Sequence, residues 1–169
     1  VENIEYYAFQ RGTVAGIANV LIATTGYTGE RTFELYLRAG EAPALWDALL
    51  AAGAPDGLVP IGLGARDTLR LEMGYMLYGN DIDATTSPLE AGLGWATKLD
   101  KGAFSSQEIF AAQKAQGLRR RLVAFEVAER GAIPRHGHAI AAPGSTEAVG
   151  QVTSGSFSPS LKMGIGLGY

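Results

Sequence analysis

The fold is decided by residues 20–37, which read VLIATTGYTGERTFELYL. The first four, from Val20 to Ala23, form a short apolar run with β-branched side chains, which is typical of a buried strand. From Thr32 to Leu37 apolar and polar residues alternate, a pattern that indicates a strand with one buried face. Two glycines interrupt the segment between these runs. The stretch therefore predicts a β-hairpin in which the odd-numbered residues from Phe33 to Leu37 face the core.

Helical patterns dominate the chain after this hairpin. Residues 41–52 carry leucines and a tryptophan at helical spacing, with a proline in the first turn and Gly53 after the end. Residues 63–73 carry a similar pattern that ends at Gly74. Both segments predict helices, since their start and stop signals agree with their apolar spacing.

The following segment mixes short elements. Ser87 to Glu90 combines an N-cap serine, a proline at the first helical position and a glutamate three residues after the cap, a capping box that predicts a short helix. Residues 94–99 then predict a strand. Residues 105–116 begin with a second cap signal and end at Gly117, so they predict another helix.

The pattern changes near residue 118, where short β segments with turn residues replace the helical spacing. Residues 122–127 and 149–153 are the clearest of these strands. We therefore expect an α+β domain over residues 1–118 and the opening of a β-barrel or sandwich over residues 119–169. The apolar, glycine-rich end at Tyr169 is unlike a natural terminus, so we also expect a piece of a longer protein.

Composition excludes several classes of protein. The chain has 169 residues with 14 Lys+Arg against 17 Asp+Glu, a net charge of −3, which argues against a dedicated nucleic-acid binder. There is no cysteine, so disulfides and thiol chemistry are excluded. No apolar run approaches the ~20 residues that span a bilayer, which argues against a membrane protein. The lack of an export signal and of cysteine predicts a cytoplasmic protein, or a mitochondrial one if the source is eukaryotic.

Three residues are candidate ligand contacts. Glu34 lies in the middle of a predicted strand, where its carboxylate is either partly buried with partners or simply exposed to water. Arg66 begins a helix, where the helix dipole disfavours a cation; it either serves a ligand or pairs with a nearby acid such as Asp67. Tyr27, between two glycines, either offers its ring for stacking or folds onto the core.

Other charged residues favour a structural interpretation. His136 and His138 point the same way if they lie on one strand and could hold a metal, but with no further histidine and no cysteine we favour the surface of a hairpin. Residues 119–121 are three arginines that fit a solvated strand start better than a polyanion site. We therefore predict no metal site.

Taken together, the motifs resemble the T-proteins of the glycine cleavage system, the tetrahydrofolate-dependent aminomethyltransferases. No single motif is specific, but many occur here in the family's order, from about residue 18 to residue 169. The matching stretches are TGYTGE at residues 25–30, FEL at 33–35, GLGARDTLRLE at 62–72, LYGNDI at 77–82, SPLEAGL at 87–93, VTSG at 152–155 and SPSL at 158–161.

This resemblance implies a folate-binding α+β module followed by the start of a C-terminal Greek-key β-barrel. It implies transfer of an aminomethyl unit from the lipoyl arm of the H-protein to tetrahydrofolate, with release of ammonia and formation of 5,10-methylenetetrahydrofolate. The family's folate-contacting glutamate, arginine and tyrosine fall on Glu34, Arg66 and Tyr27. Its catalytic aspartate belongs to an N-terminal segment that nothing in this chain matches, so this piece alone is expected to lack activity. The end of the barrel is also expected to be missing.

Two relatives of the family offer alternatives. One is the folate domain of a sarcosine or dimethylglycine dehydrogenase, although those enzymes usually carry Trp-Gly where Tyr78-Gly79 stands here. The other is a non-enzymatic folate-binding iron–sulfur assembly factor. Residues 101–108 resemble the signature of that group, but Ala103 replaces its cysteine.

Overall fold

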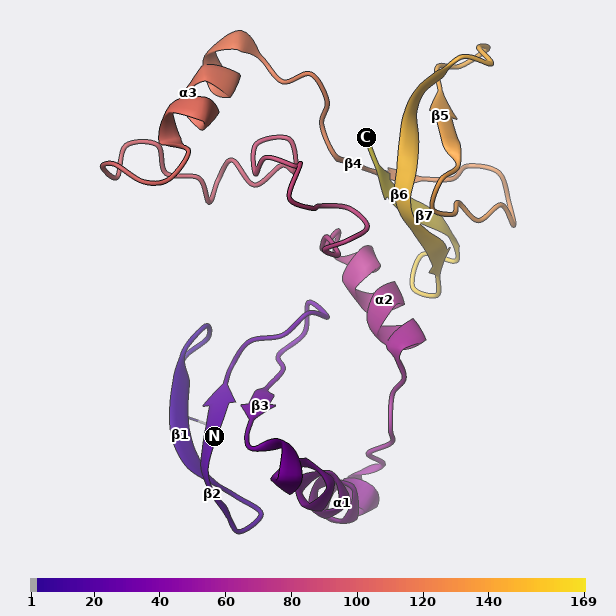
Figure 1. The fold of residues 1–169 in the computed structure, drawn as a ribbon. Coiled ribbons are helices and arrows are strands. Elements are labelled where there is room, and N and C mark those ends of the chain that lie inside the picture. Colours follow the sequence, from indigo (N-terminus) through magenta and orange to yellow (C-terminus); the bar gives the residue numbers. More distant parts are fainter. Residues whose placement is uncertain (1–2) are drawn as a thin grey trace. The chain divides into compact units, whose positions relative to one another are not determined.

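A computed structural model describes residues 3–169 of the chain (Figure 1). The chain divides into two compact units, one of Val1–Arg70 and the other of Leu71–Tyr169. Helices and sheets occur together, which confirms the predicted α+β class. Among the described residues, no helix has both the length and the apolar character that crossing a bilayer requires.

The first unit is built on a three-stranded antiparallel sheet of order β1-β2-β3. Its strands are β1 (Phe9–Val14), β2 (Ile17–Ala23) and β3 (Glu34–Tyr36). The predicted hairpin is confirmed, with Ala23 paired to Glu34. Leu35 and Leu37 pack against the buried side chains of Val20 and Ile22, as the alternation predicted. Phe33 does not, because β3 begins only at Glu34 and the Phe33 side chain is left 42% exposed.

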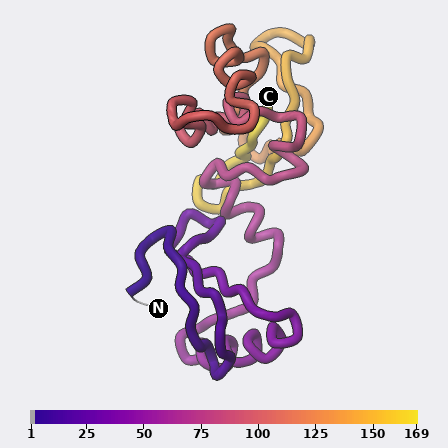
Figure 2. The backbone as a smooth tube through the Cα atoms, turned by 60° about the vertical axis from the view of Figure 1, so that its left-hand side comes forward, coloured from indigo at the N-terminus to yellow at the C-terminus, as the bar shows by residue number. Residues whose placement is uncertain are grey.

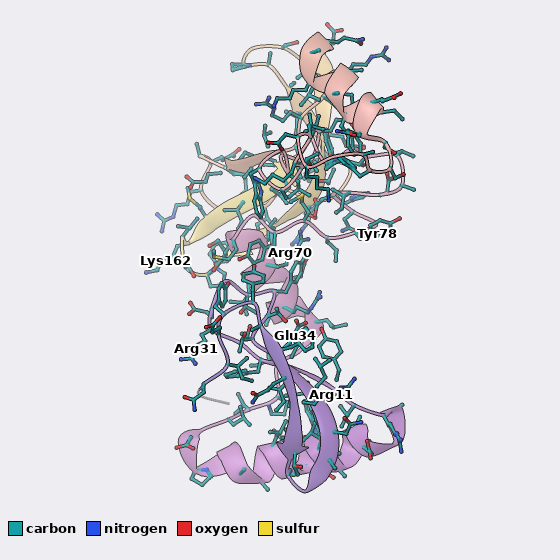
Figure 3. All side chains as sticks on the ribbon, turned by 90° about the vertical axis from the view of Figure 1, so that its left-hand side faces the viewer. Arg11, Arg31, Glu34, Arg70, Tyr78 and Lys162 are labelled. Carbon is teal, nitrogen blue, oxygen red and sulfur yellow. The ribbon has the colours of Figure 1, made fainter. Side chains whose placement is uncertain are left out.

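Helix α1 (Ala42–Gly53) follows the sheet and confirms the helix expected over residues 41–52. Figure 3 shows it running across the direction of the strands. Gly53 lies inside the helix rather than after it, because a 3-10 turn (Ala54–Asp56) continues the chain. The left-handed residue that ends this helical segment is Gly57, with φ of 77°, a conformation that glycine adopts without strain.

Helix α2 (Leu63–Glu72) confirms the second predicted helix and ends before Gly74, whose φ is 68°. Residues 73–106 then pass through successive turns (Figure 2). Helix α3 (Gln107–Gln116) confirms the helix predicted from residue 105. Its capping residue, Ser106, has φ of 64° and makes no side-chain cap hydrogen bond, so the predicted cap is wrong.

The capping box at Ser87 is present, but the helix predicted from it is not. The amide of Glu90 donates to Ser87 Oγ at 3.2 Å, and the amide of Ser87 donates to Glu90 Oε2 at 2.9 Å. The chain then turns away at Gly92, with φ of 77°. A single turn has too few hydrogen bonds to offset the entropy of nucleating a helix.

The strand predicted over residues 94–99 is also wrong. The amides of Ala96 and Thr97 donate to Leu93 and Gly94, in the pattern of consecutive turns. Gly94, at the start of this segment, weakens any strand, and turn hydrogen bonds replace the expected ladder.

The second unit contains a four-stranded antiparallel sheet of order β4-β7-β6-β5. Its strands are β4 (Val123–Glu126), β5 (Ala139–Ala141), β6 (Ala148–Ser158) and β7 (Met163–Gly168). This confirms the strands predicted within residues 122–127 and 149–153. Ile165 and Leu167 of β7 form a core cluster with Leu71. The domain boundary expected near residue 118 stays a prediction.

Strand β7 alternates glycines with these core residues, and close packing explains the glycines. A Cβ added at Gly166 would lie 2.5 Å from Cζ of Phe125 and 2.9 Å from the carbonyl oxygen of Ser154. At Gly168 it would lie 2.6 Å from the carbonyl oxygen of Gln151. No side chain fits at these positions unless the neighbouring backbone moves.

Candidate functional site

The turn between β2 and β3 contains Tyr27 and leads to Glu34, two of the predicted ligand contacts, and a pair of threonines closes it. The hydroxyl of Thr32 donates to the carbonyl of Thr25 at 3.0 Å. A Cβ on Gly26 would lie only 1.6 Å from Thr32 Oγ1, so glycine is required for the chain to pass this hydroxyl. The turn is therefore shaped by the threonine pair and by a residue without a side chain.

Glu34 is the first residue of β3 and its side chain is exposed (Figure 3). Of the two interpretations of Glu34, the structure thus favours the exposed one over the partly buried one. The carboxylate still has a partner, because Thr25 donates its hydroxyl to Oε2. Among the residues that the structure describes, no hydrogen bond engages Oε1. One carboxylate oxygen is thereby fixed and the other is open to a ligand.

Arg66 and Tyr27 are brought together by the fold of the first unit. The guanidinium carbon of Arg66 lies 4.6 Å from the centre of the Tyr27 ring, within the range of a cation–π interaction. Arg66 is exposed in the first turn of α2, and the Tyr27 side chain is half-buried. The ring therefore offsets part of the cost of a cation at this end of the helix.

The alternative partner suggested for Arg66 is wrong. Asp67 pairs with Arg70, whose Nη2 lies 2.6 Å from Asp67 Oδ1 and whose Nε donates to the same oxygen at 2.7 Å. Residues three apart on a helix lie on one side of it, whereas adjacent residues do not. The spacing along α2 therefore favours Arg70 over Arg66 as the partner of Asp67.

The two charges of the candidate site do not neutralise each other. Within residues 3–169, no hydrogen bond or ion pair joins Glu34 to Arg66. The site thus offers a carboxylate that accepts hydrogen bonds and a guanidinium that donates them, with an aromatic ring beside the guanidinium. Such a set can bind a planar heterocycle that has adjacent N–H groups on one edge and acceptors elsewhere.

A second polar cluster lies in the other unit, beside a cavity of about 200 Å³. Arg120 donates from Nε to Glu90 Oε1 at 3.0 Å and stacks over the ring of Tyr169, with 4.6 Å from Cζ to the ring centre. The amide of Ser87, aided by Arg120, holds the pKa of Glu90 below its ordinary value, and burial raises the pKa of Tyr169. The partners of Arg120 belong to the protein itself, so this cluster fastens the turns at residues 85–90 to the start of the second sheet.

Two larger cavities of this unit are lined by none of the predicted ligand contacts Glu34, Arg66 and Tyr27. One of about 690 Å³ is lined by apolar side chains that include those of β4 and β5, and by His138. The other, of about 500 Å³, has Trp95, Lys114 and Arg121 in its lining. The residues predicted from sequence thus do not coincide with either cavity.

The histidines are used locally. His136 Nδ1 lies 2.8 Å from the carbonyl oxygen of Thr153, and His138 Nδ1 accepts a hydrogen bond from the amide of Arg135 at 3.3 Å. Both side chains are exposed. In the part of the chain that the structure describes, no three histidine, cysteine or acidic side chains gather in a way that could hold a metal ion.

Sequence reasoning missed Thr25, the partner of Glu34. The strand register explains the contact: Ala23 pairs with Glu34, so Thr25 falls opposite Thr32 and diagonal to Glu34, within reach of a side chain on the same face. The sequence signal for this contact is the pair of polar residues Thr25 and Glu34 on opposite sides of the turn. It predicts a contact only when the strand register is known.

Comparisons with known proteins give one consistent result. The family model described as the GCVT N-terminal domain matches residues 1–101. The one described as the glycine cleavage T-protein C-terminal barrel domain matches residues 120–169.

Individual relatives agree with these family models. The chain is 55% identical over 170 residues to an aminomethyltransferase of Phocaeicola vulgatus, covering all of this chain and 46% of that protein. It is 56% identical over 171 residues to one of Porphyromonas gingivalis, covering 100% and 47%. The crystal structure of glycine cleavage system aminomethyltransferase T from Bartonella henselae matches with a TM-score of 0.87 at 32% identity, covering 100% of this chain and 45% of that one. The chain thus spans about half the length of the relatives it matches.

Proposed function

The chain belongs to the glycine cleavage T-protein family, and on that premise we propose that it is part of an aminomethyltransferase. The reaction moves the aminomethyl carbon from the lipoyl sulfur of the H-protein to tetrahydrofolate. Its bonds to sulfur and to the amine nitrogen break, and bonds to N5 and N10 of the folate form. The two N–H protons of the folate end on the sulfur and on the departing ammonia, which leaves 5,10-methylenetetrahydrofolate.

The observation that carries the ligand class is that the first unit holds both the exposed carboxylate of Glu34, with one oxygen open, and the stacked pair of Arg66 and Tyr27. The pterin of a folate presents a ring N–H and an exocyclic amine side by side, and an ionised carboxylate accepts both as a bidentate pair. The guanidinium of Arg66 suits the acceptor groups of the pterin. Tyr27 contributes an aromatic surface on which the guanidinium, and the flat ring near it, can pack.

The other participants follow from family membership alone. The lipoylated H-protein would be the partner and tetrahydrofolate the second substrate, with no metal, no nucleic acid and no membrane involved. The catalytic aspartate of the family would lie outside this chain, so activity would need a protein of its relatives' length. A cytoplasmic location, or a mitochondrial one for a eukaryotic source, stays a prediction from the sequence.

Isothermal titration with a reduced folate tests the proposal, on the protein at the length of its relatives. We expect Glu34→Gln to weaken binding by about 1.5–3 kcal/mol, the scale of a hydrogen bond to a charged group. Glu30→Gln is the matched control, since Glu30 is an exposed carboxylate in the same turn, and it should bind like the wild type. Absence of binding by the wild type, or equal binding by Glu34→Gln, would contradict the proposal.

A turnover assay tests the reaction itself. The protein is mixed with aminomethylated H-protein, with and without tetrahydrofolate, and ammonia and 5,10-methylenetetrahydrofolate are measured together. The proposal expects the two products in equal amounts and only when folate is present. Oxidation of an N-methyl substrate instead would assign the protein to another class of enzyme.

A further inference from the structure

The carboxylate of Glu34 is held by a residue that no motif assigned to the site. Thr25 donates its hydroxyl to Glu34 Oε2. The backbone of Thr25 is itself fixed, because its carbonyl accepts from the Thr32 hydroxyl at 3.0 Å. A β-branched side chain has few rotamers available, so a Thr25 with a fixed backbone has a hydroxyl with a fixed direction.

We propose that Thr25 is a positioning residue, which presents the free oxygen of Glu34 to the heterocycle of the substrate. The inference rests on the proposed function, in which Glu34 contacts the pterin edge. An exposed glutamate otherwise samples many side-chain rotamers, and ordering them on binding lowers affinity. With Thr25 in place, that ordering has already occurred before the ligand arrives.

The contact leaves enough acceptor capacity for the ligand. Each carboxylate oxygen has two acceptor positions, and Thr25 uses one of those on Oε2. The second position on Oε2 and both on Oε1 can still accept the two adjacent N–H groups of a pterin. Thr25 therefore orients the carboxylate without competing with the substrate.

Two substitutions separate the hydroxyl from the shape of the side chain. Thr25→Val keeps the volume and the branching but removes the donor, whereas Thr25→Ser keeps the donor. In titrations with a reduced folate we expect Thr25→Val to weaken binding about five- to tenfold, the scale of one ordinary hydrogen bond, because the contact is exposed and acts on binding only through Glu34. Thr25→Ser should remain within about threefold of the wild type, because the donor is retained.

A double-mutant cycle distinguishes positioning from a general effect on the turn. If Thr25 acts through the carboxylate, Thr25→Val should cause little further loss when Glu34→Gln is already present. A purely structural role would give the same loss in both backgrounds, and that result overturns the proposal. Thr32→Val should follow the same pattern, because Thr32 acts on Glu34 only through the backbone of Thr25. Its effect should also shrink when Glu34→Gln is present.

The outcomes also separate this inference from the proposed function. If neither the wild type nor any variant binds reduced folate, the function itself fails. If Glu34→Gln weakens binding and Thr25→Val does not, the function stands and the positioning role is wrong. Thermal unfolding of each variant is measured in parallel. If Thr25→Val does not fold, Thr25→Ala serves as the second variant without the donor.

Discussion

The carboxylate of Asp81 accepts a hydrogen bond from the hydroxyl of Ser154 at 2.9 Å, although 73 residues separate them in the chain. Thr153 donates to the other oxygen at 2.5 Å, and the amide of Leu77 donates to the carboxylate at 2.8 Å. The Asp81 side chain is almost fully buried. The LYGNDI stretch at residues 77–82 is thereby anchored to β6, which gives this part of the family pattern an architectural role.

Replacing Asp81 should strongly destabilise the second unit. In Asp81→Asn one acceptor oxygen becomes a donor, which leaves a buried hydroxyl or amide without a partner. We expect a loss of about 2–4 kcal/mol in the free energy of unfolding, measured by urea denaturation followed by circular dichroism. Asp83→Asn is the control, because Asp83 is exposed and its partners Thr85 and Thr86 are close in sequence. A loss equal to that of the control would contradict the anchoring role.

Glu72 should contribute a pH-dependent part of the stability. Its carboxylate accepts from the Ser158 hydroxyl at 2.5 Å and from the amide and hydroxyl of Ser160 at 3.1 and 2.8 Å. These bonds, that from Ser158 foremost, hold the pKa of Glu72 below its ordinary value of 4.5. The stabilisation is therefore complete above pH 4.5 and disappears as the pH falls through the lowered pKa.

The variant Glu72→Gln tests this pH dependence. At pH 7 it should unfold at a lower temperature than the wild type, by an amount equivalent to about 1 kcal/mol, since Glu72 is only half-buried. The difference should shrink in unfolding experiments below pH 4.5. A difference that is the same at pH 7 and pH 3.5 would show that the carboxylate charge has no part in it.

Two threonines of the first unit should respond in opposite directions to the same substitution. Thr28 Oγ1 is buried and has no hydrogen-bond partner among residues 3–169. Thr24 is also buried, but its hydroxyl donates to a backbone carbonyl and accepts from the amide of Ala8 at 3.2 Å. Removing an unsatisfied hydroxyl relieves its desolvation cost, whereas removing a paired one leaves its partners unsatisfied.

We therefore expect Thr28→Val to raise the free energy of unfolding by about 1 kcal/mol and Thr24→Val to lower it by about 1–3 kcal/mol. Thermal unfolding of the ligand-free chain measures both. The two variants serve as controls for each other, because the chemical change is identical. A shift of the same sign in both would contradict the assigned environments.

Binding should depend on the planar guanidinium of Arg66 and on the aromatic ring of Tyr27. Arg66→Lys keeps the charge but loses the planar donors, so we expect about tenfold weaker binding of a reduced folate. Tyr27→Phe keeps the ring and should bind like the wild type, whereas Tyr27→Leu should weaken binding. Titration calorimetry measures all three. If Arg66→Lys bound the reduced folate as tightly as the wild type, the guanidinium would have no role in the site.

The elements that could be predicted from sequence were those with a strong local pattern. The hairpin over residues 20–37 and the helices over 41–52 and 63–73 combine apolar periodicity with clear boundary residues. Where local signals had to compete with glycines, as at Gly92, prediction failed: the capping box formed its hydrogen bonds, but no helix followed. The expected cap before α3 failed similarly, because Ser106 adopts a left-handed conformation.

The candidate site residues stay a prediction from the sequence, and their contacts could not be predicted from it. The residue types at Glu34, Arg66 and Tyr27 suggested a ligand, and the stacking of Arg66 on Tyr27 agrees with that interpretation. The contact of Thr25 with Glu34 depends on strand register. The register is set by the geometry of the turn in the folded hairpin, which could not be read from the sequence. The pairing of Asp67 with Arg70 rather than Arg66 could have been inferred from helical spacing alone.

The glycines of β7 have a consequence for inherited variation. Every missense change in a glycine codon adds at least a methyl group, and at Gly166 and Gly168 that carbon would collide with the neighbouring backbone. The neighbouring Ile165 and Leu167 are buried core residues, and cores tolerate aliphatic substitutions that conserve volume. In a library of random point mutants, folded variants should therefore carry amino-acid substitutions only at alternate positions of this strand. At the codons of Gly166 and Gly168, surviving clones should carry synonymous changes only.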